Sequence, residues 1–448
     1  MDRIDVEATP RGPRIFLGPV EVAGYYSALG RDFRALGIDA VAVDLHGNRF
    51  QYARDGERLP LAARAAAAAT RRRSRATRWP GLWKAVLAIA TVPLFLWAIV
   101  RFDTFVFGFR ASFFGLHDLW LLRRLGKRVF FVFHGTDARP PYMDGQDMSP
   151  ATGLSSAECA ALAAHKKRQI RTIERHATMV ISHPLYSQFQ ERRYVRALAL
   201  GMPGDSGRDG GPVRAPHGTR TRILHSPSNP EVKGTAEIRA AIDALTDEGL
   251  PIDYLEVVGV PNATVLREIE LSDVVVDQLY SDTAMASLAS EAAWRSRPSI
   301  VGSYGWDELR RLIPSEELAP VRSCHPDEAA RAIRELVEDA AGREDLGRRA
   351  FDFVRERSAP GLVAARYLRV FRDDIPAEWM SDPMDVRYCS GSGLTQDRVR
   401  DVVRAIIDQS GPAALQLGDK PLLEAILVDL AFGRGSAEDG HRSEVTRS

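Results

Sequence analysis

Short apolar runs alternate with longer amphipathic stretches over most of this chain of 448 residues. In the first half, the runs that predict β-strands are residues 14–17, 38–45, 103–109, 128–133 and 179–182. Between such runs apolar residues recur at helical spacing, as they do at Tyr25, Leu29, Phe33 and Leu36. Strands that alternate with helices in this way indicate βαβ units and a parallel sheet.

The same alternation resumes in the second half, after a charged stretch rich in Gly and Pro. The strand-like runs there begin at Ile223 and continue at residues 254–260, 273–278 and 298–301. The two halves predict two α/β domains with Rossmann-like βαβ units. We place them at residues 13–205 and 221–375 and expect a linker at residues 206–220.

The two ends of the chain differ from these domains. Residues 1–12 are expected to form a flexible N-terminus, and the polar residues 433–448 a disordered tail. Residues 376–432 contain two amphipathic helices, with apolar residues clustered at 399–407 and at 422–430. Such a pair is too small to fold alone, so we expect a small helical extension that packs on the main body or on a partner.

Charge and cysteine content exclude several classes of protein. The formal net charge is +1, so the chain as a whole is not suited to binding a polyanion such as nucleic acid. Its cysteines, Cys159, Cys324 and Cys389, match neither zinc spacing nor a disulfide framework, which favours a reducing compartment. The charged first residues lack the apolar core of a signal peptide, and we expect a cytoplasmic location.

One segment, residues 71–100, departs from the α/β pattern. It begins with an arginine cluster at residues 71–78 and continues with an almost wholly apolar stretch. A membrane span there would place strands of one sheet on opposite sides of a membrane, which disfavours that interpretation. A basic cluster beside Trp-rich apolar sequence favours an element in the interface of an anionic membrane. A buried helix with a solvated arginine face is the alternative.

Polar residues follow the predicted strands of the second half, at the ends where parallel sheets bind ligands. Lys233 stands before Gly234 at a helix start, a position that suits a phosphate group. Glu291 on a later helix carries a carboxylate that can accept hydrogen bonds from two ribose hydroxyls. Asp277 and Gln278 end the strand between them. These residues together predict a nucleoside-diphosphate pocket.

A second group of polar residues follows the predicted strand at residues 128–133. It consists of His134, Asp137 and Arg139, and the three together predict a site more sharply than a lone histidine would. Gly24 stands near the start of the first helix. A glycine there either lets a ligand approach the backbone or only serves the turn.

On these residues the chain resembles the GT-B glycosyltransferases, and among them the family-4-like retaining enzymes. The resemblance covers about residues 13–375 and rests on four segments in a fixed order. These are the first loop and helix at residues 18–37, the strand that ends at His134, the lysine loop at residues 228–235, and the helix and strand at residues 290–301. It implies a GT-B fold, in which two Rossmann-like domains face each other across a cleft.

The resemblance also implies roles for single residues. Lys233 would neutralise the diphosphate of the donor, Glu291 would hold its ribose, and Gly24 would let the diphosphate approach the first loop. His134 would lie beside the transferred sugar, and we group Asp137 with it as the catalytic residues. The donor-binding set is completed by Ser228, Asn229, Gln278 and Thr283. The leaving diphosphate would help to take the proton of the acceptor, and no metal or other cofactor is expected.

We therefore expect a retaining glycosyltransferase that moves a sugar from a nucleoside-diphosphate sugar to an acceptor on the N-terminal domain. The acceptor would be a lipid-linked sugar, an envelope polysaccharide or a natural product, with peripheral membrane contact through residues 71–100. Two departures leave alternatives open: Thr283 stands where the family often has a glutamate, and no arginine stands shortly before Lys233. The alternatives are a nucleotide-sugar epimerase or hydrolase on the same fold, and a catalytically inactive binding or scaffold subunit.

Overall fold

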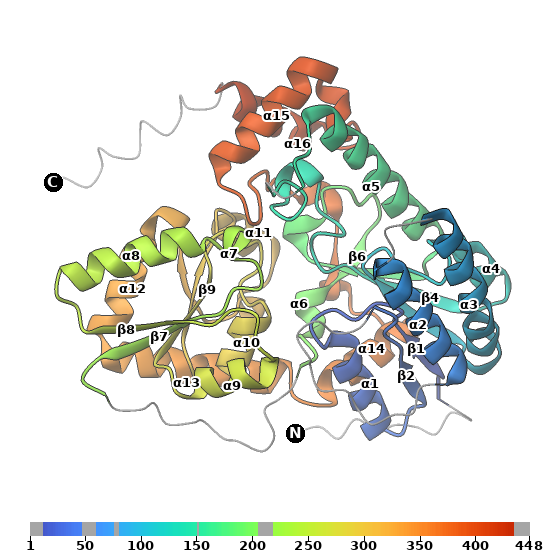
Figure 1. The fold of residues 1–448 in the computed structure, drawn as a ribbon, viewed down its shortest axis with the longest axis horizontal. Helices are drawn as coiled ribbons and strands as arrows, with labels where there is room; N and C mark the ends of the chain where they lie inside the picture. The colour runs from blue at the N-terminus through green and yellow to red at the C-terminus, as the bar shows by residue number, and fades with distance from the viewer. Residues whose placement is uncertain (1–11, 47–59, 76–79, 150–151, 205–217, 434–448) are drawn as a thin grey trace.

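The computed structural model describes residues 12–46, 60–75, 80–149, 152–204 and 218–433, which form two mainly parallel sheets flanked by helices (Figure 1). The predicted flexible N-terminus, the linker and the tail lie almost wholly outside these residues. The two-domain α/β architecture predicted for a GT-B fold is confirmed.

The N-terminal sheet has the strand order β12-β6-β5-β4-β3-β1-β2. Its strands are β1 (Ile15–Leu17), β2 (Ala40–Ala42), β3 (Thr104–Gly108), β4 (Arg128–Val132), β5 (Met179–Ser182), β6 (Tyr194–Arg196) and β12 (Met380–Ser381). All neighbours are parallel except β12, which pairs antiparallel with β6.

Helices cover both faces of this sheet, which explains why its strands are continuously apolar. One face carries Phe16, Phe105 and Phe131 into a core with α2 (Leu61–Arg75), α3 (Pro80–Arg101), α4 (Leu119–Arg124) and α5 (Ser156–His176). The other face carries Ile15 and Val106 into a core with α1 (Tyr25–Ala35) and α14 (Leu362–Phe371). Alternate residues of each strand therefore serve two different cores.

The C-terminal sheet has the strand order β11-β10-β9-β7-β8 and is wholly parallel. Its strands are β7 (Thr221–His225), β8 (Ile252–Glu256), β9 (Val274–Gln278), β10 (Ser299–Gly302) and β11 (Arg322–Cys324). The helices between and after these strands are α7 (Pro230–Lys233), α8 (Thr235–Asp247), α9 (Asn262–Glu270), α10 (Ser287–Ala293), α11 (Trp306–Leu312), α12 (Ala329–Glu338) and α13 (Ala340–Arg357).

Both sheets reverse their strand order at one point. In the N-terminal sheet the chain leaves β1 for β2 on one side and continues with β3 on the other. In the C-terminal sheet the same reversal occurs at β7, between β8 and β9. Loops diverge at such a switch point and leave a crevice beyond the carboxyl ends of the strands, where ligands bind.

The last part of the chain returns to the N-terminal domain (Figure 1). The hydroxyl groups of Tyr367 on α14 and Tyr25 on α1 lie 2.6 Å apart, and the rings of Phe371 and Phe130 lie 4.5 Å apart. The domain boundary predicted at residue 375 assigned α14 to the C-terminal domain. In the structure, the apolar face of α14 packs into the core of the N-terminal domain. Helices α15 (Gln396–Ser410) and α16 (Pro421–Phe432) form the predicted extension, and α15 packs on α5.

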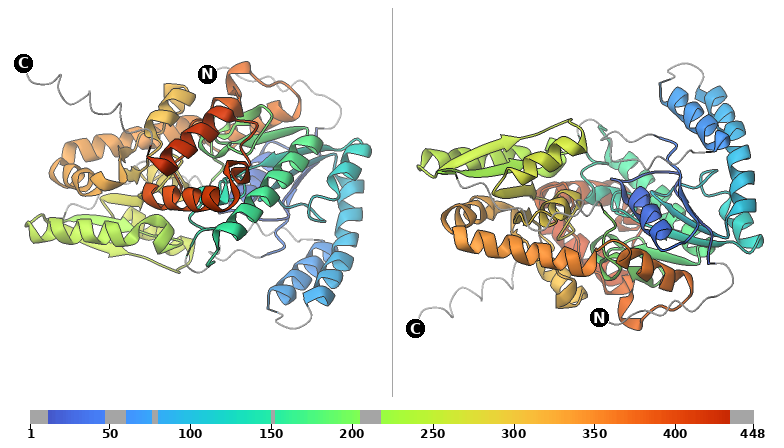
Figure 2. Two further views of the ribbon diagram at one scale, coloured as in Figure 1. Left: turned by 90° about the horizontal axis from the view of Figure 1, so that it is seen from above. Right: turned by 90° about the horizontal axis from the view of Figure 1, so that it is seen from below.

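Residues 71–75 and 80–100 belong to helices α2 and α3, which pack against each other on the outer side of the N-terminal domain (Figure 2). Leu94, Phe95 and Ala98 of α3 are buried in the core under the sheet. In the described part of the chain, no helix combines the length and apolar character that crossing a membrane requires.

The elements that sequence analysis missed are short. β6 and β11 have three residues each, too few to show a period, and β8 begins at Ile252 rather than at residue 254. The longer strands β4 and β9 begin within one residue of their predicted positions.

Candidate functional site

A cleft between the carboxyl ends of the two sheets contains a main cavity of about 470 Å³. The N-terminal domain contributes residues 20–23 after β1 and Phe109 after β3. The C-terminal domain contributes side chains around β7, β9 and α10, among them Ser226, Ser228, Lys233, Asn262, Asp277 and Glu291. The main cavity therefore lies where the two switch points face each other.

Lys233 reaches this cavity from the end of α7, and two side chains hold its ammonium group. Its Nζ donates to Oε1 of Gln278 and lies 3.7 Å from Oδ1 of Asp277. Gly234 follows with a φ of 72°, and a Cβ there would lie 3.1 Å from the Leu279 side chain, so glycine is needed for this turn. The result is an oriented cation at the wall of the cavity, a good partner for a phosphate oxygen.

Glu291 lines the same cavity from α10. Asn262, the first residue of α9, donates from Nδ2 to Oε1 of Glu291 at 2.8 Å, which orients the carboxylate. Ser228 lines the cavity as well, whereas Asn229 is the N-cap residue of α7, makes no capping bond and is absent from the lining. Three predicted donor residues, Ser228, Lys233 and Glu291, are thus brought to one cavity.

The loop between β1 and α1 is held by Glu21, a residue that sequence analysis did not single out. Its carboxylate accepts hydrogen bonds from three backbone N–H groups of this loop and helix and from the Ser27 hydroxyl, at 2.6–3.0 Å. Burial raises the pKa of Glu21, against the lowering effect of these donors. Gly24, with a φ of 79°, lines a side cavity of about 170 Å³ together with Glu291.

His134 follows β4 and lines an inner cavity of about 230 Å³. Its Nε2 lies 3.0 Å from the Tyr26 hydroxyl, and its ring makes an edge contact with Tyr25 at 5.0 Å between centroids. Burial lowers the pKa of His134, so the imidazole is neutral at neutral pH. The inner and main cavities share Val22 and other lining residues, so His134 adjoins the Lys233 site.

Asp137 occupies a different position from the one predicted for a catalytic residue. Its side chain is wholly buried, and Oδ1 accepts hydrogen bonds from the backbone N–H groups of His134 at 2.8 Å and Gly135 at 2.9 Å. It is not among the described residues that line the main, inner or side cavity. The structure therefore places Asp137 behind His134, where it shapes the loop.

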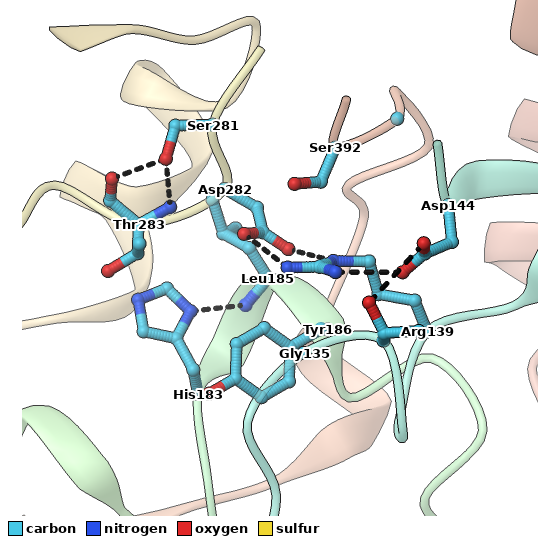
Figure 3. A network of polar contacts seen from close by, with 12 residues as sticks. Gly135, Arg139, Asp144, His183, Leu185, Tyr186, Ser281, Asp282, Thr283 and Ser392 are labelled. Atoms are coloured by element: carbon cyan, nitrogen blue, oxygen red, sulfur yellow. Dashed lines mark hydrogen bonds and ion pairs between the residues drawn. The ribbon is translucent and has the colours of Figure 1, made fainter. Parts of the chain in front are cut away.

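A buried ion network joins the two domains beside the inner cavity (Figure 3). Arg139 of the N-terminal domain binds both carboxylate oxygens of Asp282 from the C-terminal domain, and its Nη1 lies 2.8 Å from Oδ2 of Asp144. Burial alone lowers the pKa of Arg139, but the two carboxylates outweigh it and raise the pKa. Gly135 leaves room for this guanidinium, since a Cβ there would lie 2.5 Å from Nη2.

Two further predicted donor residues occupy supporting positions. Gln278 accepts from Lys233 and donates from Nε2 to the Ser281 hydroxyl at 2.6 Å, so it links the lysine to the loop after β9. Thr283 lines the inner cavity, and its backbone N–H donates to the same hydroxyl at 3.1 Å. The network around Ser281 thus fixes the loop that carries Asp282 and Thr283 (Figure 3).

Sequence analysis noted Arg139 but did not pair it with Asp282, and it missed Asn262 and His183 altogether. Because Asp282 stands beside Thr283, a predicted donor residue, the sequence could have placed Asp282 near the site. Nothing in the sequence pairs it with Arg139. Within the described residues, no three His, Cys, Asp or Glu side chains are arranged to hold a metal ion. The predicted absence of a metal requirement stays a prediction.

Comparisons with known proteins give no family assignment, because no protein-family model and no curated protein match the chain. Similar solved structures include the glycosyltransferase SnogD from Streptomyces nogalater, with 16% identity and a TM-score of 0.36 over 80% of this chain and 98% of that one. Anabaena HepE in complex with UDP and glucose has 11% identity and a TM-score of 0.45 over 80% and 99%. A glycosyltransferase from Rickettsia africae has 11% identity and a TM-score of 0.47 over 82% and 99%. Because these scores are low, we infer function from the residues of the cleft.

Proposed function

We propose that this chain is a glycosyltransferase that uses a nucleoside-diphosphate sugar as donor. The observation that carries the proposal is the convergence of Lys233 and Glu291 on one cavity between two facing switch points. A lysine ammonium suits a diphosphate, and a carboxylate suits the two hydroxyls of a ribose. Both residues belong to the C-terminal domain, so that domain would bind the donor and the N-terminal domain the acceptor.

In the proposed reaction the bond between the anomeric carbon and the phosphate oxygen breaks, and a bond to the acceptor oxygen forms. The acceptor's proton passes to the leaving diphosphate. Lys233 stabilises the negative charge that develops on that diphosphate, and the cleft excludes water that would otherwise hydrolyse the donor. His134 lies at the inner cavity, where sugar and acceptor would meet. Retention of configuration and independence from metal rest on the family resemblance alone.

The first test is a thermal-shift panel of UDP, ADP, GDP and their common sugar conjugates on the full chain. A nucleotide at 100 times its dissociation constant stabilises the folded protein by about 2.7 kcal/mol, so we expect one of these ligands to raise the Tm by several degrees. The matching base then defines the donor for turnover assays. If no nucleotide raises the Tm, the proposal is wrong.

The products of turnover distinguish the alternatives that the sequence left open. Transfer to an added acceptor supports the glycosyltransferase. Free sugar, or an isomerised nucleotide sugar, formed without an acceptor would support a hydrolase or an epimerase. Binding without turnover over a broad acceptor panel would support an inactive binding subunit, the alternative suggested by Thr283 in place of the family's glutamate.

We propose further that the outer surface of α3 contacts an anionic membrane, which suits a lipid-linked acceptor. Ile89, Val92, Leu96 and Val100 follow one another along one face of α3 and are 72%, 42%, 53% and 78% exposed. Arg71 and Arg72 are exposed near the end of the adjoining helix α2. The helix pair lies on the side of the N-terminal domain away from the C-terminal domain, so a flat surface can approach it (Figure 2).

The membrane proposal predicts that the double variant Ile89→Gln/Leu96→Gln binds vesicles rich in anionic lipid at least about tenfold more weakly. Each apolar side chain that enters the interface contributes on the order of 1 kcal/mol, and about 1.4 kcal/mol is tenfold. Co-sedimentation with vesicles measures the loss. Leu271→Gln, at a leucine 43% exposed in the C-terminal domain, is the matched control.

Replacing the arginines at 71, 72, 73, 75 and 78 by glutamine should weaken binding only to anionic vesicles. Equal binding by all variants would rule out the proposed surface.

A further inference from the structure

His183 is a buried histidine at the domain boundary. It follows β5 directly, is 2% exposed, and its Nδ1 accepts a hydrogen bond from the Leu185 backbone N–H at 3.2 Å. Its ring stacks on Tyr186 with 5.1 Å between centroids and 25° between planes. The guanidinium of Arg139 lies 5.4 Å from the centroid of the same tyrosine ring. The orientation of the His183 ring is therefore fixed by a hydrogen bond and by stacking.

The other ring nitrogen of His183 has no protein partner. Since Nδ1 acts as an acceptor, the proton of the neutral imidazole resides on Nε2. Burial lowers the pKa of His183 to about 4, so the neutral form dominates at neutral pH. Nε2 is buried and makes no hydrogen bond. Folded proteins leave few buried donors unpaired, and such an exception asks for an explanation, of which an absent ligand is one.

The position of His183 indicates which part of a ligand this donor would meet. His183 lines the inner cavity together with His134 and Thr283, and Figure 3 shows its ring turned toward the loop of Thr283. The inner cavity shares Val22, Ala23, Ala286 and Ser287 with the main cavity, which holds Lys233. A diphosphate at Lys233 would therefore extend its sugar into the inner cavity.

Several neighbouring polar groups of the inner cavity have protein partners. Arg139 and Asp282 bind each other, and the Tyr186 hydroxyl donates to the Phe133 carbonyl at 3.2 Å. Among the described lining residues, His183 Nε2 and Arg357 Nε are buried donors without a hydrogen bond. The Arg357 guanidinium still donates to the Leu198 carbonyl through Nη2, whereas Nε2–H is the one N–H of the neutral His183 ring and makes no bond. A donor of this kind favours ligands that place an oxygen opposite it.

We propose that His183 is a specificity residue whose Nε2–H donates a hydrogen bond to a hydroxyl oxygen of the donor sugar. This inference rests on the proposed function and assigns the inner cavity to the sugar part of the donor. It implies that a nucleotide sugar lacking that hydroxyl, or carrying it in the opposite configuration, binds more weakly.

Two variants separate the proposed contact from structural roles of His183. His183→Asn keeps an oxygen that can accept from the Leu185 N–H, as Asp382 does for Met384, but it is too short to reach the cavity. His183→Phe keeps a ring on Tyr186 and removes both nitrogens. His165→Phe, at an exposed histidine on α5, is the matched control. The melting temperature of each free variant establishes that it is folded.

The measurement is the ratio of the dissociation constant of the nucleotide sugar to that of its nucleoside diphosphate, with both constants from calorimetry. We expect this ratio to be about fivefold higher in both His183 variants than in the wild type and the His165→Phe control. A change of about fivefold in affinity corresponds to the loss of one hydrogen bond. The affinity for the nucleoside diphosphate itself should not change. A parallel titration with a nucleotide deoxy sugar should show which sugar hydroxyl accepts the hydrogen bond from His183.

The outcomes distinguish this inference from the proposed function. An unchanged ratio in both variants, with normal diphosphate binding, overturns the role of His183 and leaves the donor site intact. Loss of diphosphate affinity in a folded variant also overturns it, because His183 would then act on the main cavity. If the wild-type chain binds no nucleoside diphosphate, the proposed function falls and this inference falls with it.

Discussion

Replacing Lys233 by methionine is expected to lower kcat/KM for the nucleotide sugar by about 10²–10³-fold, the usual effect of removing one group that stabilises a developing anion. Methionine keeps most of the apolar stem of the lysine and removes only the ammonium. The ammonium lies in the main cavity, held by Gln278 and Asp277, and is therefore already oriented before the donor binds. Steady-state kinetics with the donor identified in the thermal-shift panel measure the effect.

Lys127→Met is the matched control for this variant. Lys127 precedes β4 at the amino end of the N-terminal sheet, and its Nζ donates to the Phe102 carbonyl at 2.8 Å, away from the cleft. Its loss should leave kcat/KM within about twofold of the wild-type value. A loss of about 10²–10³-fold is expected only for a group that contacts the reacting centre. If Lys233→Met and Lys127→Met have the same activity, Lys233 does not bind the diphosphate.

Lys233→Met also removes the cation beside Asp277, whose Oδ2 is buried without a hydrogen-bond partner. A fall in stability is therefore expected together with the loss of activity. The double variant Lys233→Met/Asp277→Asn removes the unpaired charge as well and should recover part of the stability but none of the activity. That split separates the catalytic role of the lysine from its structural role.

Those parts of the site that depend on strand ends were predictable from the sequence. In a parallel sheet all carboxyl ends meet at one edge, so Lys233 and Glu291 had to lie near one crevice, and His134 at the same edge of the other sheet, once their strands were recognised. The structure brings Lys233 and Glu291 to one cavity and His134 to the next. Asp137 shows the limit of this reasoning, because position after a strand does not tell which way a side chain turns.

What the sequence did not reveal depends on contacts between distant segments. Helix α14 has an apolar face that suits either core, and only the return of the chain to the N-terminal sheet decides between them. The pairing of Arg139 with Asp282 depends on how the two domains face each other, which no local pattern encodes. The open hydrogen bond of His183 follows from tertiary burial in the same way.

Replacing Arg139 by methionine is expected to destabilise the chain by about 3–5 kcal/mol, as the loss of one partner from a buried ion pair does. The side chains of Asp282 and Asp144 are 2% and 1% exposed, so the variant leaves two carboxylates buried without their cation. Asp144 is held ionised by this cation: burial raises the pKa of Asp144, but Arg139 brings it below its usual value. The midpoint of urea unfolding, followed by fluorescence and circular dichroism, measures the loss.

Arg310→Met is the matched control, because Arg310 pairs with Asp307 on the surface of α11 with exposures of 48% and 102%. An exposed pair contributes less than about 1 kcal/mol, so the two variants should differ by several-fold in their effect on stability. Asp282→Asn in the Arg139→Met background removes one of the stranded charges and should restore part of the loss. Since Arg139 and Asp282 come from different domains, this recovery would show that the pair acts across the cleft. Equal losses in Arg139→Met and Arg310→Met would show that the pair does not stabilise the contact between the domains.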